Sequence, residues 1–544
     1  MARRLIAVLA LVAVLAPVQG SDRRAAAQVL PEARRPSVLL IVTDDQSKAL
    51  FNRELMPAVF SRLVDRGVLF DNTYVNTAQC CPSRAQILTG LYGRHSGVDG
   101  NHVPLLHPTI AELMKDEGYR TAIAGKYMNS APCMPRSEFD LWACIRTDQK
   151  HVSLKDPVIN IGGKARKHRG YQTEVLRKLV ADFIEGTPDD QPFFAVYSPT
   201  SPHMPADDDR YESLDVDIPR SPSYDEATDL TGKPAFMRRG PLSQIEKARI
   251  DSTYTKMARS VRALDDSIAK LLTSLGDRAS DTIVIFMSDN GYLYGEHRAT
   301  KKVLAYEESI KVPMVIRANG VSGARASVAF DGLASNVDVA ATLAAVVGRQ
   351  WASDGVSLLP AVTGQTDVVR ESVLVEFCNG LRYPCEGTGG WGSRRFPSFS
   401  GVVQDGYKYV EYFTGEAELY DLGLDPYEMT NLFGAPGMGA IGQRLSDEIE
   451  SLTTGAPLDT MIVAGPPDSF AGTTASFRYS SQNRLSAFVC RTTRDGIPGA
   501  WFGCPAFGFT LGKLTPGHYV LEVAGRYEGW TDPTPASRSF TVTT

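Results

Sequence analysis

The sequence predicts an α/β protein with a large, mostly parallel sheet flanked by helices, followed by a small C-terminal β-sandwich. Three observations predict this architecture. Short apolar runs alternate with amphipathic helical patterns from residue 37 onward. Beyond about residue 455 only alternating strand patterns occur, separated by glycine and proline. The length of 544 residues suits one large domain and one small one.

The elements of the large domain alternate in chain order. Strand patterns occur at 37–45, 119–127, 192–198 and 282–291, and helical patterns precede the last three at 109–117, 171–186 and 259–276. A strand–helix–strand order of this kind is typical of a parallel sheet. Residues 204–240 are polar and rich in proline, so we expect a long surface excursion near the site.

The first 27 residues are predicted to be a signal peptide. Arg3 and Arg4 precede an apolar run from Leu5 to Val18, and small residues follow. The run is shorter than the roughly 20 residues that a membrane span needs. Cleavage is expected after Gly20 or near Ala27, with an uncleaved anchor as the alternative. The protein is therefore expected to be secreted or associated with the cell envelope.

Export makes disulfide bonds available to the eight cysteines. Proximity in the sequence alone suggests three local pairs and leaves Cys80 and Cys81 unpaired. The three pairs are Cys133–Cys144, Cys378–Cys385 and Cys490–Cys504.

The charge balance argues against a nucleic-acid partner. The net charge is -5 and no block of like charge occurs. A nucleic-acid-binding protein would usually carry a basic face.

Two acidic clusters follow buried strands. Asp44 and Asp45 end the first strand pattern, and Asp289 and Asn290 lie at the end of the pattern at 282–291. Because ligands bind beyond the carboxyl ends of strands in open α/β sheets, the two clusters can converge on one cation. Carboxylate and amide oxygens suit Ca²⁺ or Mg²⁺. The alternative is that these residues only cap helices or form turns.

The stretch "TAQCCPSRAQILTG" predicts a nucleophile beside an anion site. Pro82 fits the first position of a helix, which places Cys80 just ahead of the helix N-terminus. Backbone amides and the helix dipole favour an anion there, and Arg84 offers a planar fork to a tetrahedral oxyanion. The alternative is a cysteine in a disulfide or buried as a small apolar residue.

Three basic residues follow or lie near strand ends: Lys126, His203 and Lys302. Each alone is more often a solvated surface residue. Together with the acidic clusters they would form a site for a charged tetrahedral ester, since cationic groups stabilise charge on its oxygens.

These residues resemble the sulfatase family of the alkaline phosphatase superfamily. Its signature, Cys-x-Pro-Ser-Arg followed by three residues and Leu-Thr-Gly, is matched from Cys80 to Gly90. Further segments match in order: "TDDQ", "AGKY", "PHMP", "SDNG", "KVLAYEESIKVP" and "AELYDLGLDPYEMTNL". The resemblance covers about residues 36–455. The residues of its motifs are most similar to those of the glucosamine-6-sulfatase and extracellular endosulfatase branch.

The resemblance implies a cofactor set and a mechanism. A dedicated formylglycine-generating enzyme would oxidise Cys80 to Cα-formylglycine, whose hydrate attacks the sulfur of a sulfate monoester. The second hydroxyl then expels sulfate, whereas a serine would remain trapped as a sulfate ester. The ligands implied for Ca²⁺, with Mg²⁺ as the alternative, are Asp44, Asp45, Cys80, Asp289 and Asn290.

The resemblance also implies roles for the basic residues. Arg84 and Lys126 would hold the diol and the metal-bound oxygens, while His203 and Lys302 would contact the sulfate as general acids. Lys301 is the neighbouring alternative, but Lys302 stands four residues before Tyr306, as the family's lysine does. One departure is Met128, where many sulfatases carry a histidine, so the base for sulfate release is unassigned.

Residues 461–544 resemble bacterial Ig-like or fibronectin-like modules, read as a spacer or as a binding module for polysaccharide or the cell surface. The leading function is a secreted sulfuric ester hydrolase acting on sulfated small molecules or glycans, such as those containing N-acetylglucosamine-6-sulfate. The alternatives are a phosphodiesterase or phosphonate monoester hydrolase of the same superfamily, and an unmodified, non-catalytic binding protein.

Overall fold

The computed structural model describes most of the chain. The described residues are 35–101, 103–129, 133–145, 153–206, 208–226, 230–378, 388–389, 396–453, 460–481, 487–505, 508–527, 530–531 and 535–544. The predicted signal peptide lies outside them.

An eleven-stranded sheet forms the centre of the fold, in the order β11-β2-β12-β8-β1-β7-β3-β4-β5-β6, with β13 paired to β2. The five consecutive strands β8-β1-β7-β3-β4 are parallel, and the strands on either side of them pair mainly antiparallel. The predicted α/β class is confirmed, with a parallel centre and antiparallel edges. The strands are β1 (Ser37–Thr43), β2 (Val68–Tyr74), β3 (Arg120–Gly125), β4 (Leu141–Ile145), β5 (Val158–Ile161), β6 (Lys164–Lys167), β7 (Phe193–Ser198), β8 (Thr282–Ser288), β11 (Lys311–Val312), β12 (Met314–Ala318) and β13 (Val328–Ser335).

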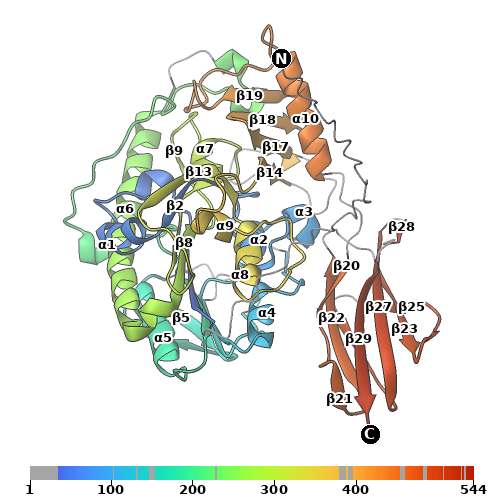
Figure 1. The fold of residues 1–544 in the computed structure, drawn as a ribbon. Helices are drawn as coiled ribbons and strands as arrows, with labels where there is room; N and C mark the ends of the chain where they lie inside the picture. Colours follow the sequence, from blue (N-terminus) through green and yellow to red (C-terminus); the bar gives the residue numbers. More distant parts are fainter. Residues whose placement is uncertain are drawn as a thin grey trace, which may run out of the picture. The chain divides into compact units, whose positions relative to one another are not determined.

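Helices cover both faces of this sheet (Figure 1). Because side chains alternate along a strand, Leu39 and Ile41 of β1 face one hydrophobic core and Val38 and Leu40 face another. Helices on the first face are α1 (Pro57–Arg62), α5 (Gln172–Glu185) and α6 (Gln244–Ser274), and those on the second are α2 (Cys80–Thr89), α4 (Ile110–Asp116), α8 (Asp338–Val346) and α9 (Leu359–Val362). The near-continuous apolar character of the central strands follows from this double coverage.

A second, smaller sheet lies within the region of the sulfatase resemblance and is not predicted by the sequence. It is antiparallel, in the order β14-β17-β18-β19, and α10 packs against it. These elements are β14 (Ser372–Phe377), β17 (Phe399–Gln404), β18 (Tyr407–Tyr412), β19 (Ala417–Asp421) and α10 (Gly439–Thr453).

The C-terminal segment forms two sheets, as predicted. One has the order β20-β22-β26 and the other contains β21-β29-β27-β23. Phe477, Phe488 and Phe540 share a hydrophobic core between them. The strands are β20 (Thr460–Ala464), β21 (Ser469–Ala471), β22 (Ala475–Ser481), β23 (Ala487–Arg494), β26 (Gly508–Leu511), β27 (Gly517–Tyr527) and β29 (Ala536–Thr543).

The cysteine predictions are confirmed where they fall on described residues. Disulfides join Cys133 to Cys144 and Cys490 to Cys504. Cys80 and Cys81 are free and buried. The predicted Cys378–Cys385 pair involves Cys385, which lies outside the described residues.

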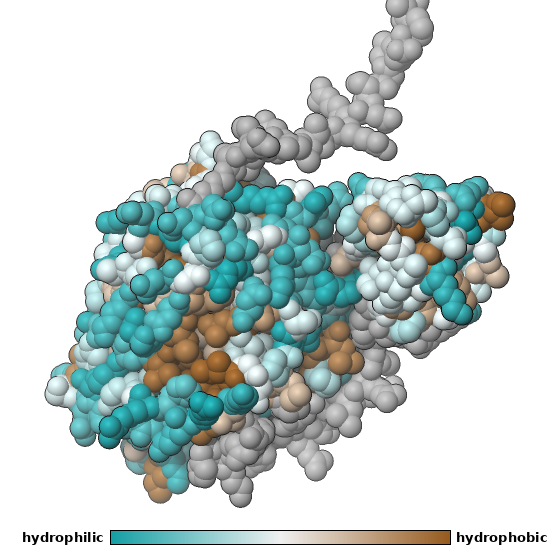
Figure 2. All heavy atoms as spheres, turned by 90° about the horizontal axis from the view of Figure 1, so that it is seen from below, coloured by the Kyte–Doolittle hydropathy of each residue, from teal (hydrophilic) through white to brown (hydrophobic). Residues whose placement is uncertain are grey.

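The helices in the part of the chain that the structure describes are not of the membrane-spanning kind. None of the helices there is both long and apolar enough to cross a bilayer. Figure 2 shows one face of the molecule, on which hydrophilic residues predominate and some hydrophobic ones gather in a patch. Apolar surface of this kind is common on folded proteins.

Candidate active site

Strand pairing brings the two acidic clusters together. β1 and β8 pair in parallel with Thr43 opposite Ser288, so Asp44 and Asp289 leave the sheet side by side. The backbone N–H of Asp45 donates to Asp289 Oδ1 at 3.1 Å. Asp45 has a φ of 65°, a left-handed conformation that is costly for a residue other than glycine and often marks a functional site.

The next strands along the sheet supply Lys126 and Ser198. Lys126 follows β3, and its ammonium pairs with Asp44 Oδ2 at 2.6 Å. Ser198 ends β7, and its hydroxyl accepts a hydrogen bond from Arg84 Nη1 at 2.5 Å. Glycine is required at position 125, at the end of β3, because a Cβ atom there would lie 1.8 Å from the carbonyl oxygen of Ser198 on the neighbouring strand. Four neighbouring parallel strands thus aim polar groups at one point beyond the sheet.

Helix α2 carries Cys80 and Arg84 to the same point. The helix begins at Cys80, two residues earlier than predicted, so Pro82 occupies its third position rather than its first. Pro82 is tolerated there because the first four N–H groups of a helix have no intrahelical partner. The Cys80 Sγ atom lies 3.6 Å from Asp44 Oδ1, and Asn101 Oδ1 accepts a hydrogen bond from the Cys81 N–H at 3.0 Å.

Arg84 is buried and joins several parts of the site. Its Nε donates to Asp289 Oδ2 at 2.8 Å and its Nη1 to the Lys126 carbonyl oxygen at 2.9 Å. Its Nη2 has no hydrogen-bond partner among the described residues. Two of the guanidinium nitrogens therefore brace the site, and the third remains able to bind an oxyanion.

Lys302 and His203 complete the group. The buried Lys302 ammonium contacts Asp45, lies 2.8 Å from Cys80 Sγ and 3.4 Å from Asn290 Oδ1. Lys301 is exposed, which favours Lys302 of the two lysines. His203 Nε2 lies 3.7 Å from Asp45 Oδ2, and its side chain is 37% exposed, so it lies at the open side of the site.

Burial and charge shift the titration of these groups in different directions. Burial alone would raise the pKa of Asp44, but Lys126 and the other cations around it lower that pKa overall. The pKa of Asp289 is raised, by burial and by the nearby Asp44 carboxylate. Burial raises the pKa of the Cys80 thiol to about 12, against the opposing effect of Lys126 and Lys302. Without a further cation, the unmodified thiol is thus a poor nucleophile near neutral pH.

The donor set fits a hard divalent cation. One donor atom each of Asp44, Cys80 and Asp289 lie within 4.8 Å of one another, and the same holds for Asp44, Asp45 and His203. The Lys302 ammonium already rests on Asp45 and Asn290, so these oxygens converge on a positive charge. Carboxylate and amide oxygens of this kind are typical ligands of Ca²⁺ or Mg²⁺.

All nine predicted site residues therefore lie around one point beyond the parallel strands. The sequence analysis missed Ser198 and Asn101. Ser198 ends the predicted strand at 192–198, and this position at a strand end was the only available signal. Asn101 lies in an irregular segment, so no periodic pattern indicated it.

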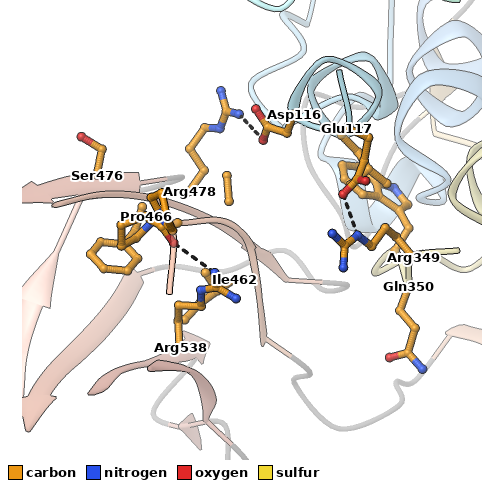
Figure 3. Close-up of a pocket in the computed structure, with 15 residues that line it drawn as sticks. Asp116, Glu117, Arg349, Gln350, Ile462, Pro466, Ser476, Arg478 and Arg538 are labelled. Carbon is orange, nitrogen blue, oxygen red and sulfur yellow. Dashed lines mark hydrogen bonds and ion pairs between the residues drawn. The ribbon is translucent and has the colours of Figure 1, made fainter. Parts of the chain in front are cut away.

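A cavity among the described residues lies at a different place (Figure 3). It measures about 680 Å³ and includes none of the nine predicted residues in its lining. Its arginines are paired with carboxylates: Arg478 with Asp116 at 3.1 Å and Arg349 with Glu117 at 2.6 Å. We place the reaction site at the strand ends, where the charged groups converge, and not in this cavity.

Comparison with known proteins decides the family. The model of the family described as Sulfatase matches residues 36–349, more than half of the chain. The chain belongs to the sulfatase family. A second model, described as N-sulphoglucosamine sulphohydrolase, C-terminal, matches residues 295–455 of this sulfatase. That range includes the antiparallel sheet β14-β17-β18-β19, which is therefore part of the sulfatase region.

The sulfatase is similar to several characterised proteins. It is 28% identical over 459 residues to human (Homo sapiens) N-acetylglucosamine-6-sulfatase, an alignment that covers 73% of this chain and 81% of that one. A solved structure in complex with its substrate D-glucosamine-2-N,6-O-disulfate has a TM-score of 0.64 at 23% identity and covers 77% of this chain and 98% of that one. The phosphonate monoester hydrolase of Agrobacterium radiobacter shares the fold, with a TM-score of 0.61 at 21% identity over 77% and 96% of the two chains.

Proposed function

We propose that this sulfatase is an exported enzyme that removes sulfate from sulfated glycans, with N-acetylglucosamine-6-sulfate units as the first candidates. The observation that carries the proposal is the position of Cys80, which lies at the N-terminus of α2 against both acidic clusters and Lys302. The 28% identical relative named N-acetylglucosamine-6-sulfatase supports the choice of sugar.

The site residues fit both groups that the family implies. Asp44, Asp45, Asp289 and Asn290 would hold Ca²⁺, with position 80 as a further ligand. When present, the formylglycine hydrate supplies the attacking hydroxyl, and the cation withdraws electron density from the sulfate oxygens. Conversion of Cys80 would require a formylglycine-generating enzyme in the host. Such an enzyme would read the signature at residues 80–90 before the chain folds, because helix α2 is buried in the folded protein.

The chain's own residues then bind and orient the ester. Lys302, 2.8 Å from the Cys80 sulfur, would stabilise charge on the sulfate and donate a proton toward the leaving oxygen. His203, at the open side, would contact the sulfate from the direction in which substrate enters. Lys126 and Arg84 would hold the oxygens at position 80 in place through their fixed contacts with Asp44 and Asp289.

The release step needs a base that the chain does not place where many sulfatases have it. Met128 is buried and carries no titratable group, and the N–H of its neighbour Asn129 donates to Cys81 Sγ at 2.9 Å. Met128 therefore cannot serve as the base for sulfate release, and we assign it no catalytic role.

The remaining parts of the chain are proposed to serve export and targeting. Residues 1–27 are proposed as the cleaved signal peptide, residues 36–455 as the catalytic domain and residues 461–544 as the β-sandwich module. That module is proposed to bind polysaccharide or the cell surface. A pull-down of the exported protein by insoluble sulfated polysaccharide, with and without the module, tests this role.

Substrate comparison tests the function. Purified, Ca²⁺-loaded protein with known formylglycine content would be assayed on N-acetylglucosamine-6-sulfate, 4-nitrophenyl sulfate, a phosphonate monoester and a phosphate diester. We expect the sulfate esters to have the higher kcat/KM, and Cys80→Ala to abolish turnover while Cys81→Ala preserves it. A higher kcat/KM on the phosphorus esters would favour the phosphodiesterase or phosphonate monoester hydrolase alternative. Absence of turnover by fully modified protein on all four esters would favour a binding protein.

A further inference from the structure

We propose a second metal site in this protein, formed by His297, Glu308 and Glu428, that takes a divalent transition-metal cation such as Zn²⁺. The three residues are distinct from those of the active site. One ring nitrogen of His297 and one carboxylate oxygen each of Glu308 and Glu428 lie within 4.8 Å of one another. An imidazole nitrogen with two carboxylates is a ligand set that Zn²⁺ accepts, unlike the all-oxygen sets preferred by Ca²⁺.

Unpartnered atoms in the cluster indicate a missing ligand. His297 is 1% exposed, yet its Nε2 has no hydrogen-bond partner among the described residues. The same holds for Glu308 Oε2 and for both carboxylate oxygens of the buried Glu226. Buried polar atoms are rarely left without a partner, because the loss of hydration is costly. A cation bound by the cluster would satisfy His297 Nε2 and Glu308 Oε2.

Glu226 is placed to orient His297 as a ligand. Its Oε2 lies 3.3 Å from His297 Nδ1, and the Lys233 ammonium lies at the same distance from that nitrogen. Of the two neighbours, the carboxylate can accept the Nδ1 proton, which leaves the Nε2 lone pair for a metal. Carboxylate–histidine–metal arrangements of this kind are common in zinc proteins.

The charge of the cluster also calls for a cation. Carboxylates outnumber the cationic side chains around the cluster. The carboxylates are Glu226, Glu296, Glu307, Glu308, Asp425 and Glu428, and the cationic side chains are Arg220, Lys233, Arg298, Lys311 and Lys408. A bound cation would reduce this excess of negative charge, which is expensive to leave uncompensated in a buried environment.

The site would fasten the loop that carries Lys302. His297 stands five residues before Lys302 and Glu308 six residues after it, so one metal would hold both ends of the loop. The polar excursion is held at the same place, because the His297 N–H donates to the Ser223 carbonyl oxygen at 2.7 Å and the Ser223 hydroxyl to Glu308 Oε1 at 3.2 Å. Glu428 brings in the segment that follows β19. The metal would act as a positioning group and not as part of the reaction.

Metal content tests the proposal. The full-length protein would be stripped of metal, loaded with excess Ca²⁺ and dialysed against Zn²⁺, and bound zinc would be measured by mass spectrometry. We expect one Zn²⁺ per chain in the wild type and in Glu212→Gln, an exposed control with the same charge change. Glu308→Gln is expected to bind Zn²⁺ at least about 10-fold more weakly. No zinc in the wild type, or equal affinity in Glu308→Gln, would overturn the proposal.

Spectroscopy separates this site from the active site and guards against misfolding. Co²⁺ bound in place of Zn²⁺ should show the intense visible absorption of a low-coordinate site with a nitrogen ligand. The absorption should persist in Asp289→Asn, which affects only the active site, and disappear in His297→Gln, with circular dichroism unchanged in both. Loss of the absorption in Asp289→Asn alone would contradict the proposal. The readout is metal binding, so the result does not depend on sulfatase activity.

Discussion

Replacement of Lys302 by methionine tests the geometry of the proposed reaction most sharply. The Lys302 ammonium lies 2.8 Å from Cys80 Sγ, the position of the nucleophile. With an effective dielectric constant of about 20, a full unit charge at that distance is worth about 6 kcal/mol. An ammonium at a similar hydrogen-bonding distance from a leaving oxygen that carries roughly half a charge would stabilise the transition state by about 3 kcal/mol, so its loss is equivalent to about 100-fold in kcat. Lys301, which is exposed, provides the matched control.

The assay compares kcat and kcat/KM of Lys302→Met, Lys301→Met and the wild type on 4-nitrophenyl sulfate. Rates are divided by the formylglycine content of each preparation, so that a change in maturation is not mistaken for a change in chemistry. We expect about 100-fold loss for Lys302→Met and less than about 3-fold for Lys301→Met. Equal losses in the two variants, or a rate near that of the wild type for Lys302→Met, would refute the assignment.

Three further predictions concern stability, pH and metal. Lys408→Met should lower the free energy of unfolding by about 3–5 kcal/mol, because it leaves the buried Glu428 without its lysine partner, whereas the more exposed Lys311→Met should cost far less. Urea unfolding decides this, and similar losses in both variants would contradict it. Burial raises the pKa of Glu308 to about 8, so the metal-free folded state binds more protons than the unfolded state between about pH 4.5 and 8. The stability of the metal-free protein should therefore fall as pH rises across that range. Glu308→Gln should make the unfolding temperature less dependent on pH, as measured by thermal unfolding. An equal pH dependence in the variant and the wild type would count against this. Chelation with EGTA should abolish sulfatase turnover and Ca²⁺ should restore it, with Asp289→Asn needing at least about 10-fold more Ca²⁺; undiminished turnover after chelation would exclude a catalytic cation.

Much of the α/β region could be predicted because its pattern is local. The strands that become β1, β3, β7 and β8 are short apolar runs, and the helices between them show a clear apolar face. Their parallel pairing then follows from the helical connections. The antiparallel edges and the sheet β14-β17-β18-β19 could not be predicted in this way, because their pairing depends on partners far away in the chain.

The residues of the active site could be predicted for the same reason. Asp44, Lys126 and Asp289 each follow a recognisable strand, and the ends of parallel strands meet at one edge of a sheet. Their roles in catalysis came from the family resemblance and not from the pattern.

The buried charge cluster could not be predicted. Lys408 lies in "YKYVEY", where it reads as a polar residue on the exposed side of a strand, yet it is fully buried. Its partners Glu307 and Glu428 come from segments about 100 residues before it and 20 residues after it. The sequence does not show which distant carboxylates a lysine will pair with in the fold. A buried lysine such as Lys408 therefore cannot be distinguished from a solvated one.

The most direct test of the formylglycine mechanism is the mass of the tryptic peptide 67–84, which contains Cys80 and Cys81, from protein made in its native host. After alkylation, we expect one alkylated cysteine, at Cys81, and an aldehyde located at position 80 by fragmentation. Two alkylated thiols in the whole population would contradict the formylglycine mechanism and would bring the binding-protein alternative to the front.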